Sequence, residues 1–290
     1  MSEKYLIGGQ AVMEGVMMRS PKKTAIVVRL PSKKLVYKVE DTKSFADKSK
    51  ILKLPFLRGV IQLIDMLVIG TKALNFSANK ALDEGESKEK ESFGFWPLFG
   101  SIFFALIFAI AIFKFLPLLA TQLIYNNLGL LRDTWAFNSM EGIIKISMFI
   151  GYVFAISFMK DVKRVFMYHG AEHKTVYCYE AGEPLTVKNV KKYSTLHPRC
   201  GTSFIIIVLI MSVVVYSFLP LNLSFFEKFA YRLLLLPVIS GMSYETIKFA
   251  GKRKFTKFLS YPGLFVQKIT TRQPTDDQIE VAIAALKKTL

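Results

Sequence analysis

The stretch WPLFGSIFFALIFAIAIF, residues 96–113, contains no charged side chain and determines how the rest of the chain is interpreted. A helix needs about 20 mostly apolar residues to cross the hydrocarbon core of a bilayer, and long charge-free stretches are typical of such helices. We therefore expect a membrane-spanning helix over about residues 93–113.

Three further windows are similarly long and apolar. They lie at about residues 142–159, 203–219 and 229–247. Lys145 lies near one end of its window, where a long side chain can reach the interface, and Arg232 and Glu245 lie near the ends of theirs. Because lipid explains these windows better than a soluble core does, we predict an α-helical polytopic membrane protein with about four transmembrane helices.

The formal net charge of +17 is unevenly distributed along the chain. Lysine and arginine crowd residues 1–92, 160–202 and 248–290, whereas residues 121–141 contain only Arg132 and residues 220–228 only Lys228. This alternation matches the positive-inside rule and places both termini in the cytoplasm. It accounts for the basic composition through membrane lipid, and we expect no nucleic-acid partner.

The remaining segments are more polar. Residues 54–74 are apolar but contain Arg58, Asp65 and Lys72, which favours an interfacial or re-entrant helix. The runs TAIVVRL and LVYKVE flank residues 31–34 and predict a small β-hairpin. Residues 83–92 have the composition of a charged linker, and the segment that begins at residue 276 has that of a capped amphipathic helix.

These features divide the chain into five regions. They are a cytoplasmic N-terminal region (1–92), the first two transmembrane helices (93–159), a cytoplasmic loop (160–202), two more transmembrane helices (203–247) and a cytoplasmic tail (248–290). Cys178 and Cys200 both lie in the cytoplasmic loop, so we expect reduced thiols. The N-terminus lacks the apolar core of a cleaved signal peptide.

All three histidines lie in that loop, and two of them form the pattern His169-Gly-Ala-Glu172-His173. Positions i and i+4 share one face of a helix, so two imidazoles at this spacing can bind one metal ion. Glu172 lies on the same side and is free to polarise water. This is the spacing of the inverzincin metallohydrolases, in which the glutamate is the general base.

A catalytic zinc usually takes three protein ligands and keeps one position for water. The sequence offers three candidates for the missing ligand, ranked His197, Glu245 and Cys200. Alternatively, His169 and His173 are surface residues of a juxtamembrane helix. A closed set of the three histidines and Cys200 would instead favour a structural metal.

The N-terminal stretch GGQAVMEGVMMR, residues 8–19, places Gln10, Glu14 and Arg19 among glycine, methionine and other small or apolar residues. One interpretation is a loop over the metal site, with Glu14 as a ligand or substrate contact. The other is an irregular entry to the β-hairpin, which the spacing alone favours.

Four stretches carry a family resemblance. They are GGQAVMEGVMMRSP (8–21), YHGAEHK (168–174), HPRCGTSF (197–204) and the C-terminal PGLFVQKITTRQP with DDQIEVAIAAL (262–274 and 276–286). They resemble the bacterial YqhQ-like membrane proteins, a family of unknown function that is described as a predicted metal-dependent enzyme. The resemblance implies the bacterial cell membrane as the location. It also draws attention to eight positions: Gln10, Glu14, Arg19, His169, Glu172, His173, His197 and Cys200.

The first functional expectation is a metal-dependent hydrolase at the cytoplasmic face, with a divalent metal, zinc before others, and Glu172 as its catalytic residue. The second is a non-catalytic scaffold, assembly factor or regulator with a structural metal. The third is a transporter. It ranks last because Lys145, Arg232 and Glu245 are expected near the ends of their spans, whereas ion relays use acids deep in the membrane.

Overall fold

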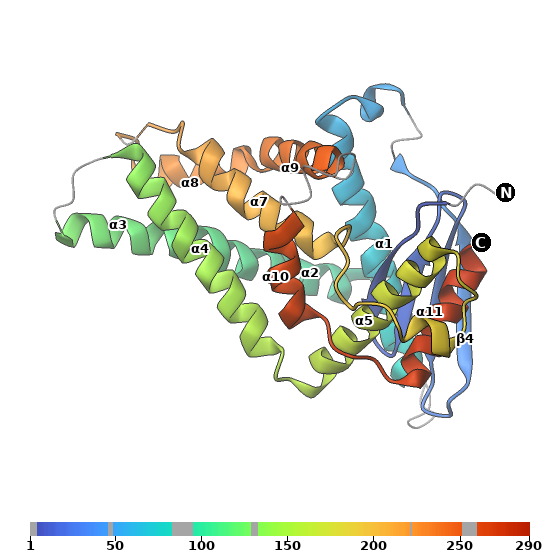
Figure 1. Cartoon of the computed structure of the whole chain (residues 1–290). Helices are drawn as coiled ribbons and strands as arrows, with labels where there is room; N and C mark the ends of the chain where they lie inside the picture. Colours follow the sequence, from blue (N-terminus) through green and yellow to red (C-terminus); the bar gives the residue numbers. More distant parts are fainter. Residues whose placement is uncertain (1–4, 46–48, 83–94, 129–132, 221, 251–259) are drawn as a thin grey trace.

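The computed structural model describes residues 5–45, 49–82, 95–128, 133–220, 222–250 and 260–290. Helices dominate these ranges, and the chain forms two neighbouring parts (Figure 1). One part is a small β-sheet with helices on both faces. The other is a group of helices that extends away from the sheet. The candidate site lies where the two parts meet.

The sheet consists of β1 (Gly8–Val12), β2 (Gly15–Arg19), β3 (Lys23–Arg29) and β4 (Leu35–Asp41), antiparallel and in that order. The pairing of Arg29 with Leu35 confirms the hairpin expected around residues 31–34. The N-terminal motif is neither an irregular entry nor a loop, since it forms the hairpin of β1 and β2. Glu14 turns the chain there with a φ of 49°, which a residue other than glycine seldom adopts.

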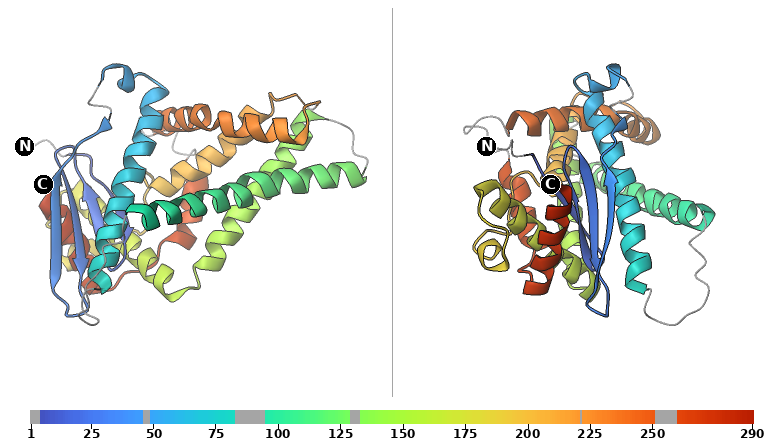
Figure 2. Two further views of the ribbon diagram at one scale, coloured as in Figure 1. Left: turned by 180° about the vertical axis from the view of Figure 1, so that it is seen from behind. Right: turned by 90° about the vertical axis from the view of Figure 1, so that its right-hand side faces the viewer.

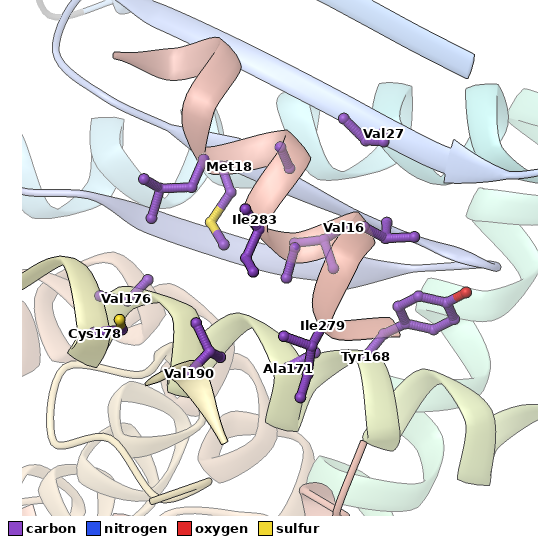
Figure 3. Packing of buried hydrophobic residues seen from close by; sticks show 14 of the residues in the cluster. Val16, Met18, Val27, Tyr168, Ala171, Val176, Cys178, Val190, Ile279 and Ile283 are labelled. Carbon is purple, nitrogen blue, oxygen red and sulfur yellow. The ribbon is translucent and has the colours of Figure 1, made fainter. Parts of the chain in front are cut away.

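Alternating side chains of the sheet pack against different helices. Val16, Met18 and Val27 face α5 (Lys160–Ala181) and α11 (Asp276–Thr289) in the main buried cluster, which Figure 3 shows from close by. Met17, Ile26 and Val28 form a second cluster with Ala73 of α1 (Leu57–Leu82) on the opposite face. The right-hand view of Figure 2 shows the sheet between α11 and α1.

The helix α11 confirms the amphipathic helix expected at the C-terminus. Gln278 accepts a hydrogen bond from the Thr275 N–H at 3.0 Å and so caps the first turn. Ile279, Ala282 and Leu286 are buried against the sheet and α5. The last helix of the chain therefore completes a core whose strands come from the first 41 residues.

The helical part begins with one long rod. The rod comprises α2 (Phe95–Ile110), a π-helical turn η3 (Ala111–Phe115) and α3 (Leu116–Leu128). The other long or apolar helices are α4 (Thr134–Ile156), α7 (Gly201–Tyr216), α8 (Phe225–Leu234), α9 (Leu236–Ala250) and α10 (Tyr261–Thr270). Short helices lie at η2 (Ile51–Lys53) and α6 (Val187–Val190).

Only two of the described helices are long and apolar enough to cross a membrane, at Phe103–Leu128 and Thr134–Ile156. The expectation of four transmembrane helices is therefore not supported. The third window became α7, which has 16 residues, and the fourth became two helices, α8 and α9. A hydropathy window averages over such a break, because Leu235 between the two helices is itself apolar.

The windows also misplaced the helix ends. Much of the segment 121–141, which lies outside the first two expected spans, is helical in α3 and α4. Lys145 lies midway along α4 and is only 1% exposed, so its side chain is buried among the helices and not near a helix end as expected. Polar residues of this segment lie within helices because they form hydrogen bonds there. Gln122 donates to Asn126 in α3, and Asn138 and Glu141 of α4 accept from Arg232. A hydropathy average does not register such bonds.

The interrupted apolar segment 54–74 lies mostly in α1, which packs against both the sheet and α9. Asp65 is buried and accepts hydrogen bonds from the Ser44 hydroxyl and the Phe45 N–H. Arg58 donates to the carboxylate of Glu245 on α9. Two of the three charges that interrupt the apolar pattern therefore make tertiary contacts that join α1 to its neighbours.

Candidate metal centre

The HxxEH pattern lies in the middle of α5, on the side of this helix that faces the start of α7 and the segment after α10. Gly170 permits this approach, because a Cβ there would clash with the carbonyl oxygen of Arg272. Arg272 also donates its N–H to Phe166 at 2.9 Å. A glycine that weakens an isolated helix thus allows a second segment to lie directly against it.

His169, His173 and Cys200 bring one possible ligand atom each to within 4.8 Å of one another. His169 Nε2 lies 3.1 Å from Cys200 Sγ, and the two imidazole centroids are 4.4 Å apart. The spacing of four residues on α5 therefore places the rings as expected. The third member, Cys200, is the residue immediately before α7.

The other nitrogen of each ring is held by a backbone carbonyl. His169 Nδ1 lies 2.9 Å from the Thr270 oxygen, and His173 Nδ1 lies 2.5 Å from the Thr195 oxygen. A carbonyl oxygen can only accept, so each neutral ring carries its proton on Nδ1. Both Nε2 lone pairs are then directed into the cluster, which is the arrangement that metal-bound histidines adopt.

His173 Nε2 is buried, and no group in the described part of the chain forms a hydrogen bond with it. Buried polar atoms in folded proteins nearly always have a partner. Burial lowers the pKa of His173, which keeps the ring neutral and its lone pair available. His173 Nε2 is therefore available as a metal ligand beside His169 and Cys200.

Cys200 also caps α7. Its sulfur accepts a hydrogen bond from the Thr202 N–H at 3.4 Å and lies 3.2 Å from the Thr202 hydroxyl oxygen. The beginning of α7 thus fixes the position of the sulfur. Two imidazole nitrogens and a cysteine sulfur are compatible with a borderline-soft divalent metal.

Glu172 is only 6% exposed, and its Oε2 lies 3.5 Å from His173 Nε2. Burial raises the pKa of this carboxyl, while the neighbouring histidines His169 and His197 oppose the rise. Gly9 of β1 lies directly against it, because a Cβ there would come within 2.7 Å of Glu172 Cγ and 2.9 Å of Oε1. The N-terminal motif therefore contributes a glycine that gives Glu172 its space.

His197 lies beside the cluster without pointing into it. Its ring centroid is 5.7 Å from that of His173, but Nδ1 accepts a hydrogen bond from the Arg199 N–H at 3.3 Å. Its Nε2 lies 3.6 Å from Glu180 Oε2. Burial also lowers the pKa of His197. The first-ranked candidate ligand thus has both nitrogens directed to other groups.

The backbone of His197 is held by Gln267 of α10, which accepts from its N–H at 2.8 Å and donates to its carbonyl at 2.9 Å. The same amide donates to Ser203 Oγ at 3.2 Å. Sequence reasoning did not single out Gln267. A glutamine within an apolar amphipathic helix was the available signal, because such a residue is buried only with partners.

The structure places the remaining candidates away from the cluster. Glu245 bonds to Arg58. Glu14 accepts both hydrogen bonds of Arg164, at 2.5 Å each, and lies within reach of the Tyr168 hydroxyl at 3.3 Å. Gln10 lies against Gly70 on α1, on the opposite face of the sheet.

Arg19 ends β2 and pairs with Gly8 across the first hairpin. Its backbone register places it two residues after Met17, so it lies on the α1 face of the sheet. The three polar residues of the N-terminal motif therefore contribute to the packing of the hairpin. Gly9, one of its three glycines, contacts Glu172.

The structure therefore defines a class of protein with two parts, an antiparallel sheet covered by helices and a set of apolar helices. A His–His–Cys cluster lies between these two parts. A family model described as "Protein of unknown function (DUF1385)" matches residues 54–290. The "Uncharacterized protein YqhQ" of Bacillus subtilis (strain 168) is 34% identical over 297 residues, covering 98% of this chain and 92% of that protein. No solved structure matches.

The chain therefore belongs to the DUF1385 family, and it is similar to YqhQ over almost its whole length. This confirms the family to which the four quoted stretches pointed. Neither description names an activity, so the function rests on the residues of the site.

Proposed function

We propose that this protein is a metal-dependent enzyme, a hydrolase, with a divalent metal held by His169, His173 and Cys200. The convergence of two fixed Nε2 lone pairs and one sulfur within 4.8 Å carries the proposal. Zinc is the first expectation, because it accepts nitrogen and sulfur ligands together and needs three protein ligands in a catalytic site. Glu172, 3.5 Å from His173 Nε2, lies where a base is needed.

The protein residues prepare the site in two ways. The Thr270 and Thr195 carbonyls fix the tautomers and orientations of the two ligand rings. Burial raises the pKa of Glu172, which favours a carboxyl group that takes up a proton and returns it to a leaving group. A divalent metal held at this site would supply Lewis-acid activation of water and of a carbonyl or phosphoryl group.

Metal content tests the proposal directly. We expect the full-length protein, purified without chelator, to contain about one metal per chain, and the variant His169→Ala/His173→Ala to contain none. His197→Gln is the matched control, because its ring nitrogens point to Arg199 and Glu180. A metal-free wild-type protein would exclude a metal role, and loss of metal in the control would show that the ligand set is different.

Glu172→Gln separates an enzyme from a non-catalytic scaffold or regulator with a structural metal. The amide keeps the size of the buried side chain and removes its capacity to accept a proton. In an enzyme, the variant retains its metal and loses hydrolysis of peptide, ester or phosphoester reporter substrates. Full activity in the variant would remove Glu172 from the mechanism and favour a structural metal.

We also infer that the helical part lies in the bacterial cell membrane as a multi-pass unit, with the sheet and both termini in the cytoplasm. Only 11% and 22% of the two long apolar windows are buried within the protein, so these helices are not covered as a soluble core would be. Phe104, Phe108 and Ile143 expose 72%, 64% and 67% of their surface. Exposed apolar surface of this extent is typical of a surface that contacts lipid or another protein.

Reporter fusions test this orientation. The C-terminal end of α3 and the N-terminal end of α4 lie at the end of the helical part opposite the sheet (Figure 1). We expect alkaline phosphatase inserted at residue 133 to be active outside the cytoplasm, and the same reporter fused after Leu290 to be inactive. An active C-terminal fusion would contradict the inferred orientation, and release of the protein from membranes by alkaline carbonate would contradict spanning.

A further inference from the structure

A second group of ionisable residues lies inside the helical part, apart from the candidate metal centre. Glu141 and Lys145 of α4 and Arg232 of α8 are each 1% exposed. Lys145 Nζ lies 3.1 Å from Glu141 Oε1. Arg232 Nη2 donates to Glu141 Oε2 and, at 2.8 Å, to Asn138 Oδ1. One buried carboxylate thus serves two buried cations.

These two cations and a third, Lys114 of η3, converge on Tyr216, the last residue of α7. Lys145 Nζ, Arg232 Cζ and Lys114 Nζ lie 4.9, 5.0 and 5.3 Å from the centroid of its ring. The Tyr216 hydroxyl accepts from Lys114 at 3.0 Å and donates to the Arg232 carbonyl at 3.0 Å. Three helical segments, η3, α4 and α8, therefore bring charged groups to one ring on α7.

The charges in this cluster do not balance. Lys114, Lys145 and Arg232 are three cations, and Glu141 is the carboxylate that the described residues bring to them. Burying an uncompensated charge costs several kcal/mol, because the low-dielectric surroundings do not replace its hydration. An anion bound beside Tyr216 would remove that cost.

Two further observations indicate a ligand. Arg232 Nε is buried and has no hydrogen-bond partner in the described part of the chain. Lys114 lies in the π-helical turn η3, which interrupts an otherwise regular helix. Such turns are uncommon and often occur at functional sites. Lys114 is also half-buried, so it forms the edge of the cluster that a ligand can reach.

We propose that Lys114, Lys145 and Arg232 form a binding site for a phosphate-type oxyanion, presented by the headgroup of an anionic lipid or by free phosphate. A guanidinium and two ammonium groups suit a group with several acceptor oxygens, and charge-assisted hydrogen bonds of this kind are the strong ones. Arg232 Nε and Lys114 Nζ donate to the oxyanion. Glu141 holds Arg232 and Lys145 in position from the other side.

Binding by the full-length protein in neutral detergent tests the proposal, with native mass spectrometry as the readout. The three probes are phosphatidylglycerol, inorganic phosphate and the zwitterionic phosphatidylcholine. We expect at least one anionic probe to bind one per chain, about tenfold more tightly than phosphatidylcholine. Binding of phosphatidylglycerol alone identifies a lipid as the source, and binding of both anions identifies the headgroup as sufficient.

Lys114→Gln should weaken this binding about tenfold, since it removes one charge-assisted donor. Lys160→Gln is the matched control, because Lys160 is an exposed lysine at the start of α5. Equal binding of the three probes by the wild-type protein would overturn the proposal, and so would equal weakening by the two variants. Either result would mean that the cluster is an internal ion pair with a neutral lysine. The comparison of the three probes on the wild-type protein remains decisive even where a variant folds poorly.

Discussion

Glycine 9 is the residue whose role in the site is easiest to isolate. A Cβ at this position would meet Glu172 Cγ at 2.7 Å and the Met17 carbonyl oxygen at 2.9 Å. The backbone oxygen cannot move aside, so we expect Gly9→Ala to destabilise the protein by about 1–3 kcal/mol, as overpacking of a filled core does. Chemical denaturation measures this change.

Gly8→Ala is the matched control for that prediction. A Cβ at Gly8 has nothing within 4 Å, although the residue lies in the same strand. We expect its free energy of unfolding to stay within about 0.5 kcal/mol of the wild-type value, as surface substitutions do. Equal losses in the two variants would mean that the glycine pair at the start of β1 tolerates no added side chain, independently of the contact with Glu172.

At single positions, the sequence identified the three members of the cluster but not the residues that surround and support them. His169 and His173 follow from a spacing of four residues within one helix, which is local information. Cys200 was a candidate, ranked below His197 and Glu245, and it is the one that lies against His169. Gly9 belongs to the N-terminal motif, but its contact with Glu172 was not predicted, and Gln267 was not singled out. Both roles depend on contacts between segments far apart in the sequence.

At the level of elements, α10 holds the segment that carries His197 and Cys200. Gln267 is fully buried and makes hydrogen bonds to both backbone groups of His197. Gln267→Ala leaves a buried N–H and a buried carbonyl without partners, which costs about 1–3 kcal/mol for each group left unpaired. We therefore expect lower stability in thermal unfolding, together with a lower metal content because Cys200 loses its support.

Lys268→Ala is the control on the same helix, since the Lys268 side chain is exposed. It should leave both thermal stability and metal content near their wild-type values. If Gln267→Ala lost stability and kept its full metal content, α10 would support the fold without positioning the site.

Elements differed in how well the sequence predicted them. The hairpin of β3 and β4 was predictable, since β-branched runs flank a turn. The hairpin of β1 and β2 was not, because four of the five residues in β2 are buried and the strand lacks the usual alternation of polar and apolar residues. The separation of α8 from α9 also escaped hydropathy, because both sides of Leu235 are apolar.

At the scale of the whole molecule, the cluster connects the two parts of the structure. His169 and His173 lie on α5, whose opposite side is buried against the sheet and α11. Cys200 begins α7, which packs against α4, α9 and α10 in the helical part. The sequence could not predict this connection, since it depends on how β1, α5, α7 and α11 come together.

A metal bound at that junction should therefore stabilise the molecule as a whole. A ligand present at about 1,000 times its dissociation constant adds about 4 kcal/mol to the folded state. We expect a chelator to lower the Tm of the wild-type protein by several degrees, and Zn²⁺ to restore it. The variant His169→Ala should show the lower Tm at the outset and no further response to chelator. A chelator effect of equal size in this variant would locate the stabilising metal elsewhere, because His169 lies 3.1 Å from Cys200 Sγ and its loss opens the cluster.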